Sequence, residues 1–224
     1  MVDEYLSERE QAEQLRHWLR ANWIWLLAGV ALTLGGYYGY QWWEARQSSR
    51  SLAAEQRFAA MLDALGRNQR DEGVRIGGEV TGEFAGTPYA DQAALVLARL
   101  DVEAGDFASA ETRLAAVAAD SDDPELRLVA NLRLARVQLA GGRHDAAMAT
   151  LDAASTPAIE PRIEELRGDV WLARGNQAAA LESYRKAQAA AGSATAAEGL
   201  FDAELLGLKI NELAAATTTA TATE

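Results

Sequence analysis

The stretch GRHDAAMATLDAA, residues 142–154, is the middle one of three similar stretches that decide the fold. The other two are GDFASAETRLAAV (105–117) and GNQAAALESYRKA (175–187). Each begins with glycine, has alanine five residues later, a large residue four beyond that, and a small residue three further on. In chain order these residues are Gly105, Ala110, Leu114 and Val117; Gly142, Ala147, Leu151 and Ala154; and Gly175, Ala180, Tyr184 and Ala187.

A second helical pattern precedes the glycines. Apolar residues before Gly142 recur at helical spacing, and so do those before Gly175; they are Leu128, Leu132, Ala135 and Leu139, then Ile163, Leu166, Val170 and Ala173. The glycines lie 37 and 33 residues apart. The unit is therefore helix, tight glycine turn, helix, with a period of about 34 residues, which is the tetratricopeptide signature. Glycine accepts the turn conformation, and alanine lets the two helices approach closely.

The same helical character extends over most of the chain. Residues 52–86 read as a further, weaker helical pair, and residues 199–215 as a closing helix that caps the stack. Proline residues at 88, 124 and 161 open helical patterns, where their missing N–H costs nothing. The prediction is an all-α repeat domain, an α-solenoid, over residues 44–213, followed by a disordered tail over 214–224 of low complexity.

An apolar stretch, NWIWLLAGVALTLGGYYGYQWW (22–43), precedes the repeats. No charged residue lies between Arg20 and Glu44. A helix of this length measures about 34 Å, enough to cross a hydrocarbon core of about 30 Å. A cleaved signal peptide is the rival interpretation. However, the C-terminal end of the stretch carries bulky residues where a signal peptidase requires small side chains. We therefore predict a single transmembrane anchor over 22–43, after a tail over residues 1–21.

Aromatic residues lie at both ends of the predicted anchor, as expected for rings at the two interfaces of a lipid bilayer. They are Trp23 and Trp25 at one end and Tyr37, Tyr38, Tyr40, Trp42 and Trp43 at the other. Gly35 and Gly39 have the spacing that lets two membrane helices approach, although small residues are common in such helices in any case. The flanking arginines are nearly balanced, so charge leaves the orientation of the anchor open.

Composition restricts the function. The net charge of −12 argues against binding to nucleic acid, whose phosphates require a basic surface. The chain has no cysteine, which excludes disulfides and thiolate metal sites. His144 falls where the sister repeats have Phe107 and Gln177, which favours packing over catalysis. The acidic loop 120–125 lacks the central glycine of a calcium loop, and capping of a helix by Asp122 or Asp123 explains it better. We predict no enzyme, no metal and no cofactor.

Several longer runs resemble the bacterial YfgM family, ancillary subunits of the SecYEG translocon. The resemblance covers about residues 1–213. It is most specific in NLRLARVQLAGGRHDAAMATLD (131–152), and it recurs in RGDVWLARGNQAAALESY (167–184), in LLGLKINEL (205–213) and in YQWWEARQ (40–47), at the end of the anchor.

The resemblance implies an orientation and partners. The N-terminal tail would be cytoplasmic and the repeat domain periplasmic, held at the inner membrane. The partners would be SecYEG, a periplasmic chaperone similar to PpiD, and newly translocated client proteins. Two other hypotheses stay open. Repeat proteins with one anchor also serve as scaffolds in cell division or polysaccharide export, and an enzyme would need an activity that no residue of the chain suggests.

Overall fold

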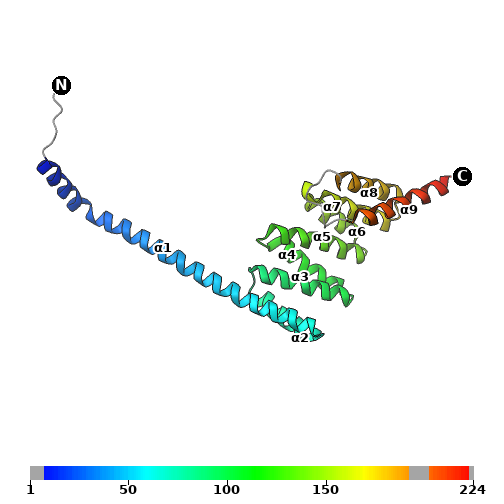
Figure 1. The fold of residues 1–224 in the computed structure, drawn as a ribbon, viewed down its shortest axis with the longest axis horizontal. Helices are drawn as coiled ribbons and strands as arrows, with labels where there is room; N and C mark the ends of the chain where they lie inside the picture. The colour runs from blue at the N-terminus through cyan, green and yellow to red at the C-terminus, as the bar shows by residue number, and fades with distance from the viewer. Residues whose placement is uncertain (1–7, 192–201, 222–224) are drawn as a thin grey trace, which may run out of the picture. The chain divides into compact units, whose positions relative to one another are not determined.

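The computed structural model describes residues 8–191 and 202–221, and all regular secondary structure in these ranges is helical. The chain divides between Leu52 and Ala53 into two compact units. The helices, labelled as in Figure 1, are α1 Glu8–Gly66, α2 Arg70–Glu83, α3 Pro88–Glu103, α4 Phe107–Asp120, α5 Pro124–Ala140, α6 His144–Ala153, the short 3₁₀ helix η1 Pro157–Ile159, α7 Glu160–Ala173, α8 Gln177–Ala191 and α9 Ala203–Thr221.

The first unit is the N-terminal part of α1. Every large apolar or aromatic side chain between Trp23 and Trp43 is exposed, on all sides of the helix, with Trp25 and Leu32 at 77%. Within residues 8–191 and 202–221, none of the helices combines the length and the apolar character that would let it cross a membrane.

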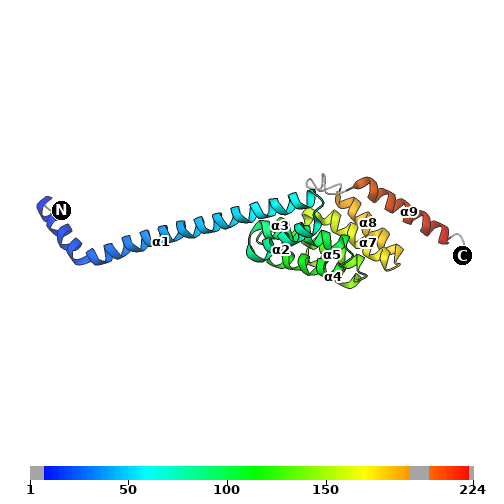
Figure 2. The ribbon, with the colours of Figure 1, turned by 90° about the horizontal axis from the view of Figure 1, so that it is seen from below.

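The second unit is a stack of four helical hairpins followed by α9 (Figures 1 and 2). Its hairpins pair the end of α1 with α2, α3 with α4, α5 with α6, and α7 with α8. Adjacent helices from α2 to α9 are in contact along the stack. The predicted all-α repeat domain is confirmed, and the weaker pair expected over 52–86 forms the first hairpin.

All four hairpins turn in the same way. In the last three, Gly105, Gly142 and Gly175 have φ between +74° and +78°. The N–H of each glycine donates to the carbonyl three residues earlier, and the next N–H donates to the carbonyl five residues before it. This is the Schellman motif of a helix C-terminus. It favours glycine because the residue that follows the helix adopts the left-handed backbone conformation. Asn68, with φ of 59°, takes the glycine's place in the first hairpin.

Buried side chains form a separate core cluster at each level of the stack. The first three clusters each join one hairpin to the next, and the fourth joins the last hairpin to α9. The second, for example, brings Leu95 of α3 and Leu114 of α4 against Leu134 of α5. A hairpin therefore completes its core only with its neighbour, as in other solenoids.

Each hairpin combines one small and one large residue at two fixed positions. One position is seven residues before the turn residue, and the other is nine residues after it. In the second and third hairpins a buried alanine is combined with a buried leucine; the pairs are Ala98 with Leu114 and Ala135 with Leu151. The fourth hairpin combines Gly168 with Tyr184, and a Cβ on Gly168 would lie 2.3 Å from the tyrosine Cε1. The first reverses the order, with Met61 packed over Gly77.

Helix α9 closes the stack over α8. Leu206 is fully buried and Leu213 nearly so, in one cluster with Leu181 and Tyr184 of α8. Lys209 Nζ lies 2.8 Å from Asp169 Oδ1 and 3.2 Å from Glu165 Oε1. The Tyr184 hydroxyl donates to the same Asp169 oxygen over 2.7 Å. The closing helix predicted from 199 onward is therefore present from Ala203, and residues 199–201 lie outside the described ranges.

The structure differs from the sequence-based expectation in two places. Helix α1 runs without a break from Glu8 through the predicted anchor into the first hairpin, and no proline interrupts it. Helix α9 continues to Thr221, through part of the tail predicted as disordered, which begins with three alanines, the strongest helix formers. Residues 222–224 of that tail and residues 1–7 of the N-terminal tail lie outside the described ranges.

Candidate functional site

A cavity of about 310 Å³ opens between three helices in the middle of the stack. We call it the α3–α5 groove. Its lining residues are Leu95, Ala98, Arg99 and Val102 of α3, Leu114 of α4, and Arg133, Arg136 and Val137 of α5. The lining combines an apolar floor with three arginines and contains no carboxylate. Its size falls at the lower end of the range for ligand pockets, about 300–1,000 Å³.

The repeat places two of the groove's three arginines at equivalent positions. Arg99 and Arg136 each lie six residues before the turn glycine of their hairpin. The corresponding residues of the first and fourth hairpins are Leu62 and Asp169. Asp169 is engaged by Lys209 of α9 and by the Tyr184 hydroxyl. Helix α9 thus supplies a cation to the last of these four equivalent positions, whereas the two in the middle, Arg99 and Arg136, line the groove.

The three arginines differ in their surroundings. Arg99 Nε lies 3.3 Å from Glu103 Oε1, an exposed ion pair, and Glu103 also binds Arg70 over 3.1 Å. Within the described ranges of the chain, the side chains of Arg133 and Arg136 have neither a hydrogen bond nor a close ion pair. Burial lowers the pKa of the half-buried Arg136 guanidinium, Arg162 and Arg133 add to this lowering, and Glu165 and Asp169 oppose it. The groove therefore holds a partly desolvated cation.

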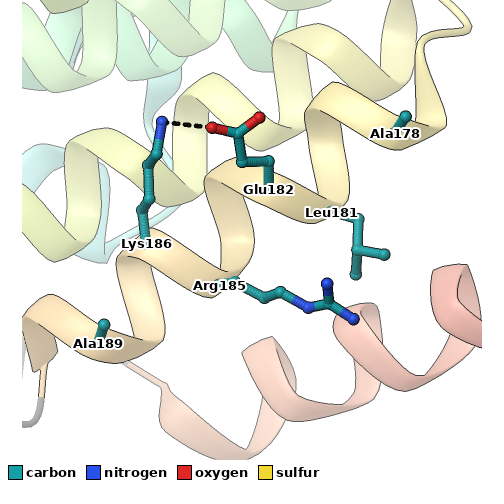
Figure 3. Close-up of a pocket in the computed structure, with 6 residues that line it drawn as sticks. All are labelled: Ala178, Leu181, Glu182, Arg185, Lys186 and Ala189. Carbon is teal, nitrogen blue, oxygen red and sulfur yellow. Dashed lines mark ion pairs between the residues drawn. The ribbon is translucent and has the colours of Figure 1, made fainter.

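A second cavity, of about 650 Å³, lies along α8. One helix supplies all its lining residues, which are Ala178, Leu181, Glu182, Arg185, Lys186 and Ala189. Figure 3 shows Leu181 and Arg185 directed toward α9, whereas Lys186 and Glu182 form an ion pair on the other side, 2.8 Å apart. Both partners of that pair are largely exposed. A shallow surface on one helix holds a ligand less firmly than a groove between three, so the α3–α5 groove is the stronger candidate.

The structure places the repeat-defining residues in the turns and the core. Gly105, Gly142 and Gly175 end the first helices of their hairpins. The alanines and large residues that follow them are at most 2% exposed: Ala110, Ala147, Ala180, Leu114, Leu151 and Tyr184. These residues build the scaffold and do not form a site by themselves, although Leu114 reaches the floor of the groove.

The residues predicted for the membrane interface are all exposed on the first unit: Trp23, Trp25, Tyr37, Tyr38, Tyr40, Trp42 and Trp43. Some contact each other; the rings of Tyr37 and Tyr38 meet edge to face, with centroids 5.6 Å apart. A Cβ added to Gly35 or Gly39 would meet nothing within 4 Å. The side of α1 that carries both glycines is therefore open.

The other residues considered as site candidates, Asp123 and His144, lie at the starts of helices. Asp123 caps α5, with its Oδ1 accepting from the N–H of Glu125 over 2.8 Å and of Leu126 over 3.3 Å. His144 is the first residue of α6, half-buried. Across the described ranges, no three side chains of the metal-binding types gather into a group. Sequence reasoning missed Arg99, Arg133 and Arg136, although the shared position of Arg99 and Arg136 before the turn glycine was a readable signal.

Comparison with known proteins agrees with this architecture. A family model described as a tetratricopeptide repeat-like domain matches residues 16–215. The chain belongs to this family. No solved structure matches it. The repeat predicted from three glycines thus extends over the hairpins and α9.

This tetratricopeptide repeat-like chain is similar to several curated proteins named ancillary SecYEG translocon subunit. The one from Escherichia coli (strain K12) is 29% identical over 93% of this chain and 98% of its own length. The one from Aggregatibacter actinomycetemcomitans is 26% identical over the same shares. The Haemophilus influenzae protein is 27% identical over 82% of this chain and 89% of its own length. The predicted resemblance is confirmed.

Proposed function

We propose that this protein is an adapter of the SecYEG translocon, held at the inner membrane, that acts by binding and not by catalysis. The observation that carries the proposal is the similarity, over nearly the whole length, to proteins named ancillary SecYEG translocon subunit. The repeat domain would bind partner segments in the α3–α5 groove. A periplasmic chaperone similar to PpiD and newly translocated proteins would be its other partners, and the lipid bilayer would hold the first unit.

The surface of α1 between Trp23 and Trp43 supports a membrane anchor. Its large apolar side chains are exposed on all sides, and an apolar surface of this extent on a monomer marks contact with lipid or with another protein. Tryptophan, tyrosine and glycine lower the mean hydropathy of the segment, but aromatic rings at the two ends fit the interfaces of a bilayer. The Thr33 hydroxyl donates to the Gly29 carbonyl over 2.8 Å, so its polar group is satisfied within the helix.

Orientation gives the first test. With the repeat domain in the periplasm, alkaline phosphatase fused after Glu224 will be active in cells, and a β-galactosidase fusion at the same place will be inactive. Both fusions are needed, because their activities must be reciprocal. Active β-galactosidase with inactive phosphatase would place the domain in the cytoplasm and contradict an adapter at the periplasmic exit of the channel.

Photocrosslinking gives the second test. A photoreactive residue at Leu32, one turn before Gly35 on the same side of the helix, will form an adduct with a SecYEG subunit in membranes. The variant Gly35→Leu/Gly39→Leu will reduce that adduct severalfold, since bulky side chains keep a partner helix at a distance. The control, Val30→Leu/Thr33→Leu, adds bulk on the opposite side of the same helix, and it will keep the adduct.

The crosslinking result separates three cases. Equal loss in the glycine variant and in the control would mean that the glycine face is not the contact. Absence of any translocon adduct at Leu32 and at several other anchor positions, in a folded protein, would contradict the adapter proposal. Adducts with division or export proteins instead would favour a scaffold in another envelope assembly.

A further inference from the structure

Two arginines of the α3–α5 groove stand apart from nearly all others in the repeat domain. Most arginines there bind a carboxylate, for example Arg113 to Asp101 over 2.8 Å and Arg162 to Glu165 over 2.7 Å. Within residues 8–191 and 202–221, Arg133 and Arg136 have no such partner, and both line the groove. Arg185, an exposed residue of α8 that is directed toward α9, is the comparable arginine outside the groove.

The two carboxylates whose charge acts on Arg136, Glu165 and Asp169, already bind other groups. Glu165 binds Arg162 and Lys209, and Asp169 accepts from Lys209 and from the Tyr184 hydroxyl. Arg136 therefore loses hydration without gaining a contact ion pair. A buried or half-buried cation of this kind costs free energy until an anion reaches it, and a guanidinium binds a carboxylate through two parallel hydrogen bonds.

The floor of the groove supplies the other half of a recognition site. Leu95, Leu114 and Val137 are buried, whereas Val102 remains 36% exposed and is accessible to a ligand. An apolar floor beside two unpaired cations fits an apolar side chain with carboxylates next to it. It does not fit a nucleic acid or another polyanion, because the chain as a whole carries a net charge of −12.

We propose that the α3–α5 groove binds an extended peptide segment in which an apolar side chain is flanked by carboxylates. The apolar side chain contacts Val102 and the floor, and the carboxylates bind Arg133 and Arg136. This inference rests on the proposed function, in which the groove holds a client or partner segment, and it names the chemistry of that segment.

Peptide binding by the full-length protein in detergent tests the inference. The probe is a fluorescent decapeptide with a central leucine between glutamates, and the comparison peptide has glutamine at each glutamate position. We expect the acidic peptide to bind at least about tenfold more tightly, with a preference that falls as salt is added. The variant Arg133→Gln/Arg136→Gln will lose this preference. The control Arg185→Gln/Lys186→Gln removes the same charge from α8 and will keep it.

Each other result overturns the inference. Equal affinity for the two peptides would remove the role of the carboxylates, and equal loss in both variants would mean that bulk charge alone attracts the probe. Tripolyphosphate competing as well as the peptide would mean a general anion site. Thermal unfolding shows that each variant is folded; should the double variant not fold, the single changes Arg133→Gln and Val102→Ser will each weaken binding.

The two proposals fail separately. Loss of peptide preference with intact translocon adducts from Leu32 overturns only the chemistry of the groove. Loss of the adducts with intact peptide binding overturns the adapter function and leaves the groove as a peptide site.

Discussion

The substitution Gly168→Ala is expected to lower the free energy of unfolding of the repeat domain by about 2 kcal/mol, the cost of overpacking a core. An added Cβ would lie 2.3 Å from Cε1 and 2.4 Å from Cδ1 of Tyr184. The tyrosine ring cannot easily move, because it is fully buried and its hydroxyl donates to Asp169 over 2.7 Å. The direction is opposite to helix propensity, which favours alanine over glycine by about 1 kcal/mol. Urea unfolding followed by circular dichroism measures it.

A matched control and a rescue make this prediction specific. Gly78→Ala changes another helical glycine, on α2, where an added Cβ meets nothing within 4 Å, and it should stabilise the domain slightly. The double variant Gly168→Ala/Tyr184→Leu reproduces the alanine and leucine combination of the second and third hairpins. It should recover part of the loss, with a coupling free energy of about 1 kcal/mol or more. Additive effects of the two changes would contradict the packing argument.

The turns and the core of the last three hairpins could be predicted from sequence because the signals are local. A left-handed turn residue favours glycine wherever it occurs, and Gly105, Gly142 and Gly175 fall at equivalent positions. The first hairpin was harder to see for the same physical reasons. Asn68 replaces the turn glycine, and the large residue of the matched pair has moved from the second helix to Met61 of the first.

The groove could be predicted only in part. A repeat position that carries Arg99 and Arg136 is visible in the sequence, but a sequence does not show which arginines lack a carboxylate. Arg162 binds Glu165 three residues along its own helix, a spacing that the sequence shows. A partner for Arg136 would have to come from another helix, and Arg136 has no close partner within the described residues. That difference depends on side-chain geometry across neighbouring helices. The surroundings of the first unit likewise depend on lipid or protein outside the chain.

The substitution Leu206→Ala is expected to produce the larger loss, about 3 kcal/mol, because it leaves a cavity under α9. Leu206 is fully buried in the cluster that holds α9 against Leu181 and Tyr184. When α9 loosens, Lys209 moves away from both carboxylates of α7; Asp169 then loses its cation, and Glu165 keeps only Arg162. Hydrogen exchange of the amides in 203–213 should accelerate along with the fall in stability.

Leu208→Ala is the control, since this side chain lies two residues along the same helix and is 61% exposed. Its effect should stay within about 0.5 kcal/mol, as for other surface changes. The pair separates packing from helix propensity, because both variants replace leucine by alanine in one helix. If both changes cost little, α9 does not close the core; if Leu206→Ala speeds exchange only in α9 and spares α7 and α8, the helix is a detachable cap and the four hairpins are stable without it.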